Sequence, residues 1–135
     1  MSMTPERQQA IWAIVLEHYR AAQVMDQYGW YNVSVACSYY AIYNAMWTAV
    51  GDPPKKRWEH EALIMKFAQG SWGMTGERIG RKARKDIVQS FYDRIGAQYH
   101  GKKFTWLDSV EGLMRARYIL SLIADTFGFS LGDVV

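Results

Sequence analysis

Apolar and polar residues alternate along most of the chain at the spacing of α-helices. The first such segment covers residues 5–28, with Thr4 in the N-cap position, a proline at the first helical position, and Gly29 as a stop signal. A second segment covers residues 31–50 and ends at the run Gly-Asp-Pro-Pro of residues 51–54. Both segments are therefore predicted to be long helices.

Three further segments share this periodicity and are predicted as helices over residues 58–69, 77–99 and 106–127. Gly70 and Gly101 follow the first two as stop signals, and Thr105 with Asp108 forms a capping-box pattern before the third. No segment has the pattern of a strand. Four long helices and one short helix with short connections predict an all-α fold, an antiparallel four-helix bundle with an additional short helix.

Length and composition indicate a single domain over residues 1–135, since domains commonly contain about 100–150 residues. The six tryptophans and nine tyrosines predict an aromatic-rich core and interface. The single cysteine, Cys37, excludes an intrachain disulfide and favours a reducing cytoplasm. The polar N-terminal residues predict no signal peptide, and no apolar run is long enough to span a bilayer, so no membrane association is expected.

One charged residue falls on the apolar face of the segment 77–99. With Ile87 at zero on a helical projection, Phe91 lies at about 40° and Arg94 at about −20°, close to the middle of that face. A buried guanidinium is costly unless a partner meets it. His100 follows six residues later, and the pattern Arg-x5-His at a helix end makes Arg94 and His100 the candidate catalytic residues.

A set of four cations lies on the opposite face of the same predicted helix, at positions i, i+3, i+4 and i+7: Arg78, Arg81, Lys82 and Lys85. These residues form either a solvated surface or a stripe that binds the phosphate backbone of RNA or DNA. The formal net charge of +3 adds little to the second interpretation. Three scattered histidines and one cysteine give no metal-ligand spacing, so neither a metal nor a cofactor is expected.

Several aromatic and histidine side chains are further candidates for a site. Tyr39 and Tyr40 point about 100° apart on a helix, so at most one is expected to face Arg94 squarely, and packing is the default role for both. His60 follows a basic run and is either a ligand or phosphate contact or an ordinary surface or capping residue. Trp72 is expected to pin the glycine-rich loop 71–76 to the body of the domain.

The run Ala36-Cys37-Ser38-Tyr39-Tyr40-Ala41-Ile42-Tyr43 resembles the Tyr-Tyr-Ala signature helix of HEPN domains, a family of small prokaryotic helical proteins. As in that family, a break, a basic stretch with a histidine and a short helix follow. The segment Phe91-Tyr92-Asp93-Arg94 resembles the arginine-bearing segment before the last helix, which reads Arg-x4–6-His in ribonuclease members. The resemblance covers most of the chain.

The resemblance implies a metal-independent endoribonuclease that acts as a homodimer, with the Arg94–His100 pairs of the two copies facing each other. It also implies a toxin of a toxin–antitoxin pair, with RNA as the substrate and a small nucleotidyltransferase as the antitoxin partner. A histidine can take the proton of the RNA 2′-hydroxyl or protonate the leaving oxygen. The donor fork of an arginine can stabilise charge on the phosphate. Tyr39, Tyr40 and Tyr99 would line such a site.

A non-nuclease branch of the family carries Arg-x-x-Ala-x-Tyr at this point, and Arg94, Ala97 and Tyr99 match that pattern. This branch implies a non-catalytic interaction module, or a module that binds nucleic acid or nucleotide, paired with a nucleotidyltransferase or another protein. Arg94 would then be structural and His100 incidental. Arg94 and His100 lie about 120° apart on a regular helix, so they converge only if the helix ends early or a dimer supplies the partner. Both interpretations stay open.

Overall fold

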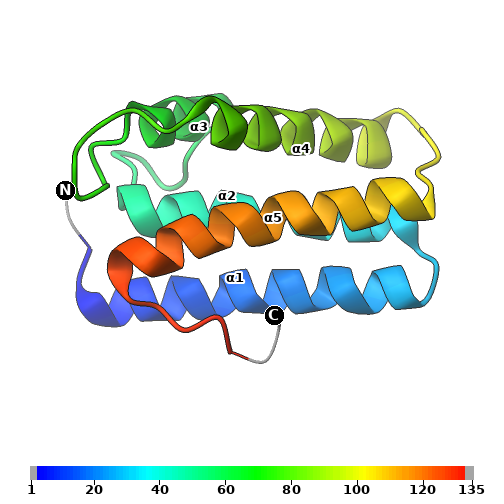
Figure 1. Ribbon diagram of the computed structural model, residues 1–135, viewed down its shortest axis with the longest axis horizontal. Helices are drawn as coiled ribbons and strands as arrows, with labels where there is room; N and C mark the ends of the chain where they lie inside the picture. Colours follow the sequence, from blue (N-terminus) through cyan, green and yellow to red (C-terminus); the bar gives the residue numbers. More distant parts are fainter. Residues whose placement is uncertain (1–2, 133–135) are drawn as a thin grey trace.

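The structure is a computed structural model that describes residues 3–132. It contains the helices α1 (Pro5–Gln27), α2 (Tyr31–Val50), α3 (His60–Gln69), α4 (Arg81–Tyr99) and α5 (Trp106–Phe127). No strand occurs within the described residues, so the prediction of an all-α fold is confirmed. Helices α1 and α4 run in one direction, and α2 and α5 run in the other (Figure 1).

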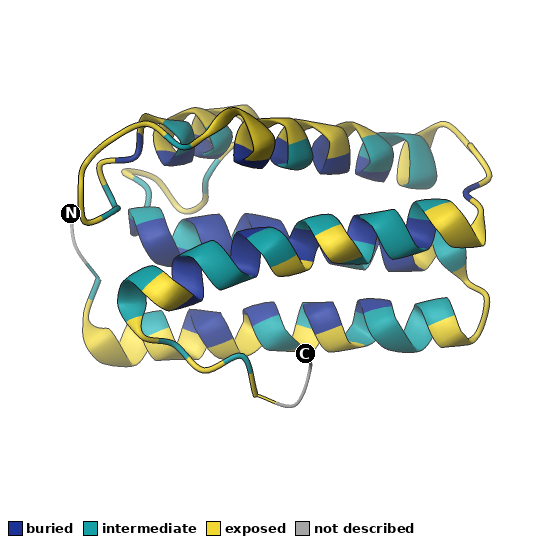
Figure 2. Ribbon diagram, in the orientation of Figure 1, coloured by how far each residue is buried: buried dark blue, intermediate teal, exposed yellow. Residues whose placement is uncertain are grey.

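Helix α2 is the centre of the molecule, because each of the other four helices packs against it. Its large residues Tyr39, Ile42 and Met46 are fully buried in the core. Its small residues allow a close approach of α5, where a Cβ added at Gly112 would lie 3.9 Å from the Cβ of Ser38. Figure 2 shows the buried faces of the helices turned toward one another. The small and large residues that alternate in the sequence of α2 thus serve two different neighbours.

The helix ends follow the signals in the sequence at most positions. The Thr4 hydroxyl caps α1 by accepting from the backbone N–H of Arg7 at 3.2 Å. Both halves of the capping box between Thr105 and Asp108 are present at the start of α5. No helix within residues 3–132 is both long enough and apolar enough to cross a bilayer.

Two helices start later than predicted. Helix α4 begins at Arg81 instead of residue 77, because the preceding segment is tied to the end of α3: the N–H of Ile79 donates to the carbonyl of Ala68 at 3.1 Å. Helix α3 begins at His60 instead of residue 58. The carbonyl of Trp58 accepts from the Tyr43 hydroxyl, and that bond holds the chain against α2 before the helix starts.

Candidate functional site

Arg94 lies in the middle of the buried face of α4, as the helical projection predicts. The residue is only 6% exposed, and its neighbours Ile87 and Phe91 on the same face are buried as well. Among residues 3–132, no carboxylate forms an ion pair with Arg94 and no group accepts a hydrogen bond from it. Its Nε is completely buried without an acceptor. An arginine in this state is a cation with unused donors.

Aromatic rings surround the guanidinium in place of a carboxylate. The Cζ atom of Arg94 lies 5.3 Å from the ring centre of Tyr39, 5.8 Å from Tyr40, 5.4 Å from Phe91 and 5.6 Å from Tyr99. All four distances fall within the range of about 6 Å for cation–π attraction. The rings stabilise the positive charge, but the Nε–H of Arg94 stays without an acceptor among residues 3–132.

The rings of Tyr39, Tyr40 and Tyr99 are therefore brought together around Arg94, and their role as the lining of a site stays a prediction. The sequence predicts that at most one of Tyr39 and Tyr40 faces Arg94 squarely; the Tyr39 ring is the nearer of the two, at 5.3 Å against 5.8 Å. Helix geometry does separate the two side chains, and their rings are 5.8 Å apart at an interplanar angle of 61°. Because the guanidinium lies within reach of both rings, it contacts both neighbours on α2.

His60 completes this cluster from the first residue of α3. Its Nδ1 lies 2.7 Å from the hydroxyl oxygen of Tyr39. Its ring centre lies 4.6 Å from that of Tyr43 and 5.7 Å from that of Phe91. Burial lowers the pKa of His60, and the positive charge of Arg94 lowers this pKa further. His60 is therefore a neutral imidazole at neutral pH.

The hydrogen bond between Tyr39 and His60 determines which imidazole nitrogen carries the proton. Burial raises the pKa of the Tyr39 phenol, so this phenol stays protonated. In the described part of the chain the Tyr39 hydroxyl has His60 Nδ1 as its hydrogen-bond partner, so we assign the phenol as the donor and Nδ1 as the acceptor. The proton of the neutral imidazole then lies on Nε2. Tyr39 thus joins two groups that can donate to an anion, the guanidinium above its ring and the imidazole at its hydroxyl.

His100 is not part of this cluster within one chain. Helix α4 continues through Tyr99, and His100 is its exposed C-cap residue. No hydrogen bond or ring contact joins His100 to Arg94 in the described structure. The helix does not end early enough to bring the two together. A pairing of Arg94 with His100 across two copies remains a prediction.

The segment that carries His100 is held in place by Asn32 from the first turn of α2. The Asn32 side-chain amide donates to the carbonyls of Ala97 at 3.2 Å and Lys102 at 2.6 Å. Its carbonyl oxygen accepts from the backbone N–H of Phe104 at 2.9 Å. Asn32 therefore fixes the path of the chain between α4 and α5.

The cationic stripe is shorter than the sequence indicated, because Arg78 precedes α4 and does not lie on its helical face. Arg81, Lys82 and Lys85 are exposed on the first turns of the helix. Lys82 forms an ion pair with Asp86 at 2.8 Å and lies 4.2 Å above the ring of Tyr118. The binding of nucleic acid by these residues remains a prediction.

The contribution of His60 is the main feature that the sequence left undecided. Its partner Tyr39 is 21 residues away in the sequence, and only the packing of α3 against α2 brings the two together.

In residues 3–132, no three His, Cys, Asp or Glu side chains are grouped so that they could hold a metal ion. Comparisons of the chain with protein-family models, curated proteins and solved structures find no match.

Proposed function

We propose that this protein is a HEPN-like, metal-independent endoribonuclease whose Arg94 binds the phosphate of the RNA strand. The fold would be the antiparallel four-helix bundle with one additional short helix that the sequence predicts, and the protein would act in the cytoplasm. The observation that carries the proposal is a buried guanidinium that has no acidic partner among residues 3–132. Such a group is costly for the fold, and an anion would supply the partner it lacks.

RNA supplies an anion of the required shape. A phosphate offers two oxygens to the planar donor fork of an arginine. The exposed ring of Tyr99 and the half-buried ring of Tyr40 lie beside the guanidinium and offer surfaces on which bases can stack. A site with these features suits one phosphate with its flanking bases.

The proposed reaction is attack by the 2′-hydroxyl of RNA on the adjacent phosphorus. A new O2′–P bond forms, the P–O5′ bond breaks, the 2′-hydroxyl proton passes to a base, and the leaving O5′ takes up a proton. The products are a 2′,3′-cyclic phosphate and a 5′-hydroxyl. Arg94 would stabilise the charge that builds on the phosphate oxygens during the attack.

Two histidines would have different roles in this proposal. His60 packs against Tyr39 and Phe91 beside Arg94 in the same chain, and as a neutral imidazole it would donate a hydrogen bond from Nε2 to a phosphate oxygen. His100 would take the proton of the 2′-hydroxyl and return it to the leaving O5′ if the proposed homodimer brings it from the other copy. A base supplied across the dimer would explain why His100 has no contact with Arg94 in its own chain.

The test is incubation of RNA with the purified protein in EDTA, followed on a denaturing gel. We expect fragments with cyclic phosphate ends, and a rate at least about 100-fold lower for Arg94→Met. Arg117→Met, an exposed arginine on α5, serves as the matched control and should leave the rate unchanged. Absence of cleavage for every RNA, or full cleavage by Arg94→Met, would contradict the proposal.

A second function is favoured by a group of exposed apolar side chains on α3 and α4, the apolar stripe, of which Tyr99 lies beside Arg94. Val88, Tyr92 and Tyr99 of α4 are 41%, 62% and 68% exposed, and Met65 of α3 is 64% exposed. Because such surfaces mark protein contacts, the chain would act as an interaction module that pairs with a second copy, a nucleotidyltransferase or another protein. Arg94 would then be structural, as the Arg-x-x-Ala-x-Tyr pattern implies.

Light scattering of the wild type and of Tyr92→Arg tests this second function for the homodimer. If the stripe joins two copies, the wild type is dimeric at micromolar concentration and Tyr92→Arg is monomeric, because the new charge cannot be desolvated at the contact. Gln89→Arg places a charge on the same helix at an already polar position and should leave the dimer intact. A wild type that is monomeric at that concentration removes the homodimer from both proposals.

A further inference from the structure

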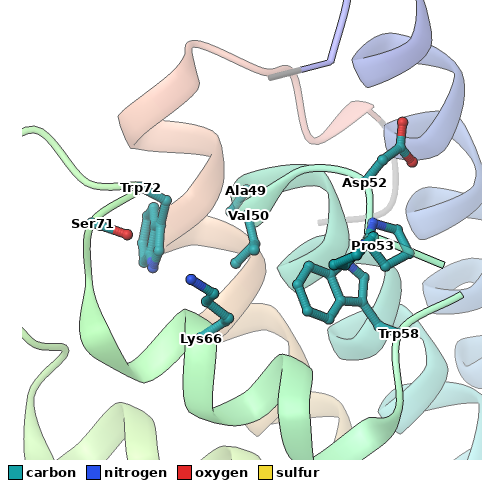
Figure 3. Close-up of a pocket in the computed structure, with 9 residues that line it drawn as sticks. Ala49, Val50, Asp52, Pro53, Trp58, Lys66, Ser71 and Trp72 are labelled. Atoms are coloured by element: carbon teal, nitrogen blue, oxygen red, sulfur yellow. The ribbon is translucent and has the colours of Figure 1, made fainter. Parts of the chain in front are cut away.

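A pocket lies where the C-terminal end of α2 meets the 51–58 loop, the last turns of α3 and the loop that follows α3 (Figure 3). Its volume is about 490 Å³, within the range of about 300–1,000 Å³ that small-molecule sites commonly have. Ala49, Val50 and two prolines contribute apolar lining. Figure 3 shows the indoles of Trp58 and Trp72 on opposite sides, with the amino group of Lys66 between them. The pocket shares no lining residue with the cluster around Arg94.

Both indoles are fixed in place by hydrogen bonds at their nitrogens. The Nε1 of Trp58 donates to the carbonyl of Gly51 at 2.8 Å. The Nε1 of Trp72 donates to the carbonyl of Phe67 at 2.7 Å, and the Trp72 ring stacks on the Phe67 ring at 4.5 Å with an interplanar angle of 9°. The walls of the pocket are therefore preorganised, so a ligand would not have to order them.

The uncompensated charge in the pocket is positive. Asp52 also lines the pocket, but its carboxylate accepts from Arg7 at 2.6 and 2.7 Å and from the indole of Trp47 at 3.0 Å. Arg7 lowers the pKa of Asp52, which keeps this carboxylate ionised and paired. Lys66 has no ion pair within the described residues. The exposed cations of residues 55–57 lie in the sequence between two lining residues, Pro54 and Trp58, and add to the positive field.

We infer that this pocket binds a flat aromatic ring that carries an anionic group, with the ring against the Trp58 indole and the anion at Lys66. Aromatic pairs gain from ring contact beyond the burial of area, and a lysine ammonium pairs with either a carboxylate or a phosphate. Two kinds of compound share this chemistry, an aromatic carboxylic acid and a nucleoside monophosphate. The inference does not depend on RNA cleavage at Arg94, because the two sites have no residue in common.

The experiment follows the indole N–H signals of the isotope-labelled protein by NMR while four probes are added separately. The probes are adenosine monophosphate, indole-3-acetate, adenosine and inorganic phosphate. The protein has six tryptophans, and the variants Trp58→Phe and Trp72→Phe assign the two signals of the pocket. Trp12 is an internal control, because its indole is buried and donates to the carbonyl of Ser130 at 2.8 Å.

We expect adenosine monophosphate, indole-3-acetate or both to shift the Trp58 and Trp72 signals to saturation while the Trp12 signal stays in place. Whichever of the two binds more tightly identifies the source of the ligand. Adenosine and inorganic phosphate should bind at least about tenfold more weakly, since each lacks half of the recognised chemistry. Lys66→Ala should weaken binding by about tenfold or more, and Lys103→Ala, an exposed lysine elsewhere, should not.

Three results would overturn the inference. The first is that neither anionic ring compound shifts the Trp58 and Trp72 signals at concentrations up to about 10 mM. The second is that inorganic phosphate alone binds as tightly as the ring compounds. The third is that Lys66→Ala binds the ring compounds with the affinity of the wild type. The Arg94→Met variant separates this inference from the proposed function. It should retain binding in the pocket even where it has lost cleavage of RNA.

Discussion

Replacing Arg94 by methionine should stabilise the fold while it removes the proposed anion site. The buried Nε of Arg94 has no acceptor in the described part of the chain, and an unsatisfied buried donor costs about 1–3 kcal/mol. The surrounding rings return about 0.5–2 kcal/mol through cation–π attraction. Methionine fills a similar volume and gains about 0.3–1.5 kcal/mol from contacts of its sulfur with the same rings. We therefore expect the free energy of unfolding to rise by about 1 kcal/mol.

Urea denaturation followed by circular dichroism measures this change. With a slope of about 2 kcal/mol/M, the midpoint for Arg94→Met should rise by about 0.5 M, while Arg117→Met should unfold like the wild type. A short RNA that the enzyme cannot cleave, with a 2′-deoxy substitution at each site, should stabilise the wild type and not Arg94→Met. A loss of stability of about 1 kcal/mol or more in Arg94→Met would refute the reasoning and favour a structural arginine.

Three further predictions concern stability. Burial lowers the pKa of both His18 and His60 from 6.5, so the unfolded chain binds more protons than the folded protein as the pH falls. The melting temperature should therefore fall as the pH drops from about 7.5 through 6.5. The fall should be smaller in a variant with both His18→Gln and His60→Gln. Gly70→Ala should lower the free energy of unfolding by at least about 3 kcal/mol in thermal denaturation, because φ is +78° and the new Cβ would lie 1.6 Å from the backbone oxygen of Glu77. Gly76→Ala is the control and should lower it by about 1 kcal/mol, because φ is +69° but the new Cβ would point into open space. Asn32→Ala should lower the free energy of unfolding by about 1–3 kcal/mol in urea denaturation, because three backbone groups lose their hydrogen-bond partner. A decrease below about 0.5 kcal/mol would contradict the role assigned to Asn32.

The sequence predicted the helices well because their start and stop signals are local. Thr4, Gly29 and the Thr105–Asp108 capping box act within one turn of the chain, and all three work as expected. The starts of α3 and α4 were placed too early, because tertiary hydrogen bonds decide them. Trp58 is held by α2 and Ile79 by the end of α3, and no local pattern encodes either contact.

The site could be predicted only in part. The burial of Arg94 follows from the periodicity of α4, which a single helical projection reveals. The contact of His60 with Tyr39 depends on how α3 returns onto α2, and a pairwise spacing in the sequence cannot show it. That Arg94 has no ion pair among the described residues is likewise a property of the packed structure, because the carboxylates of the same helix pair with other cations, Asp86 with Lys82 and Asp93 with Arg115.

The most direct test of the account is the single-turnover rate of RNA cleavage in EDTA by the wild type and by His60→Gln. A glutamine amide can still accept from the Tyr39 hydroxyl, so the fold should persist and circular dichroism can verify it. We expect cleavage by the wild type and a rate at least about 100-fold lower for His60→Gln, because the hydrogen bond from His60 Nε2 to the phosphate is lost. Equal rates for the two proteins, or no cleavage by a folded wild type, would contradict an RNA-cleaving site at Arg94 and His60.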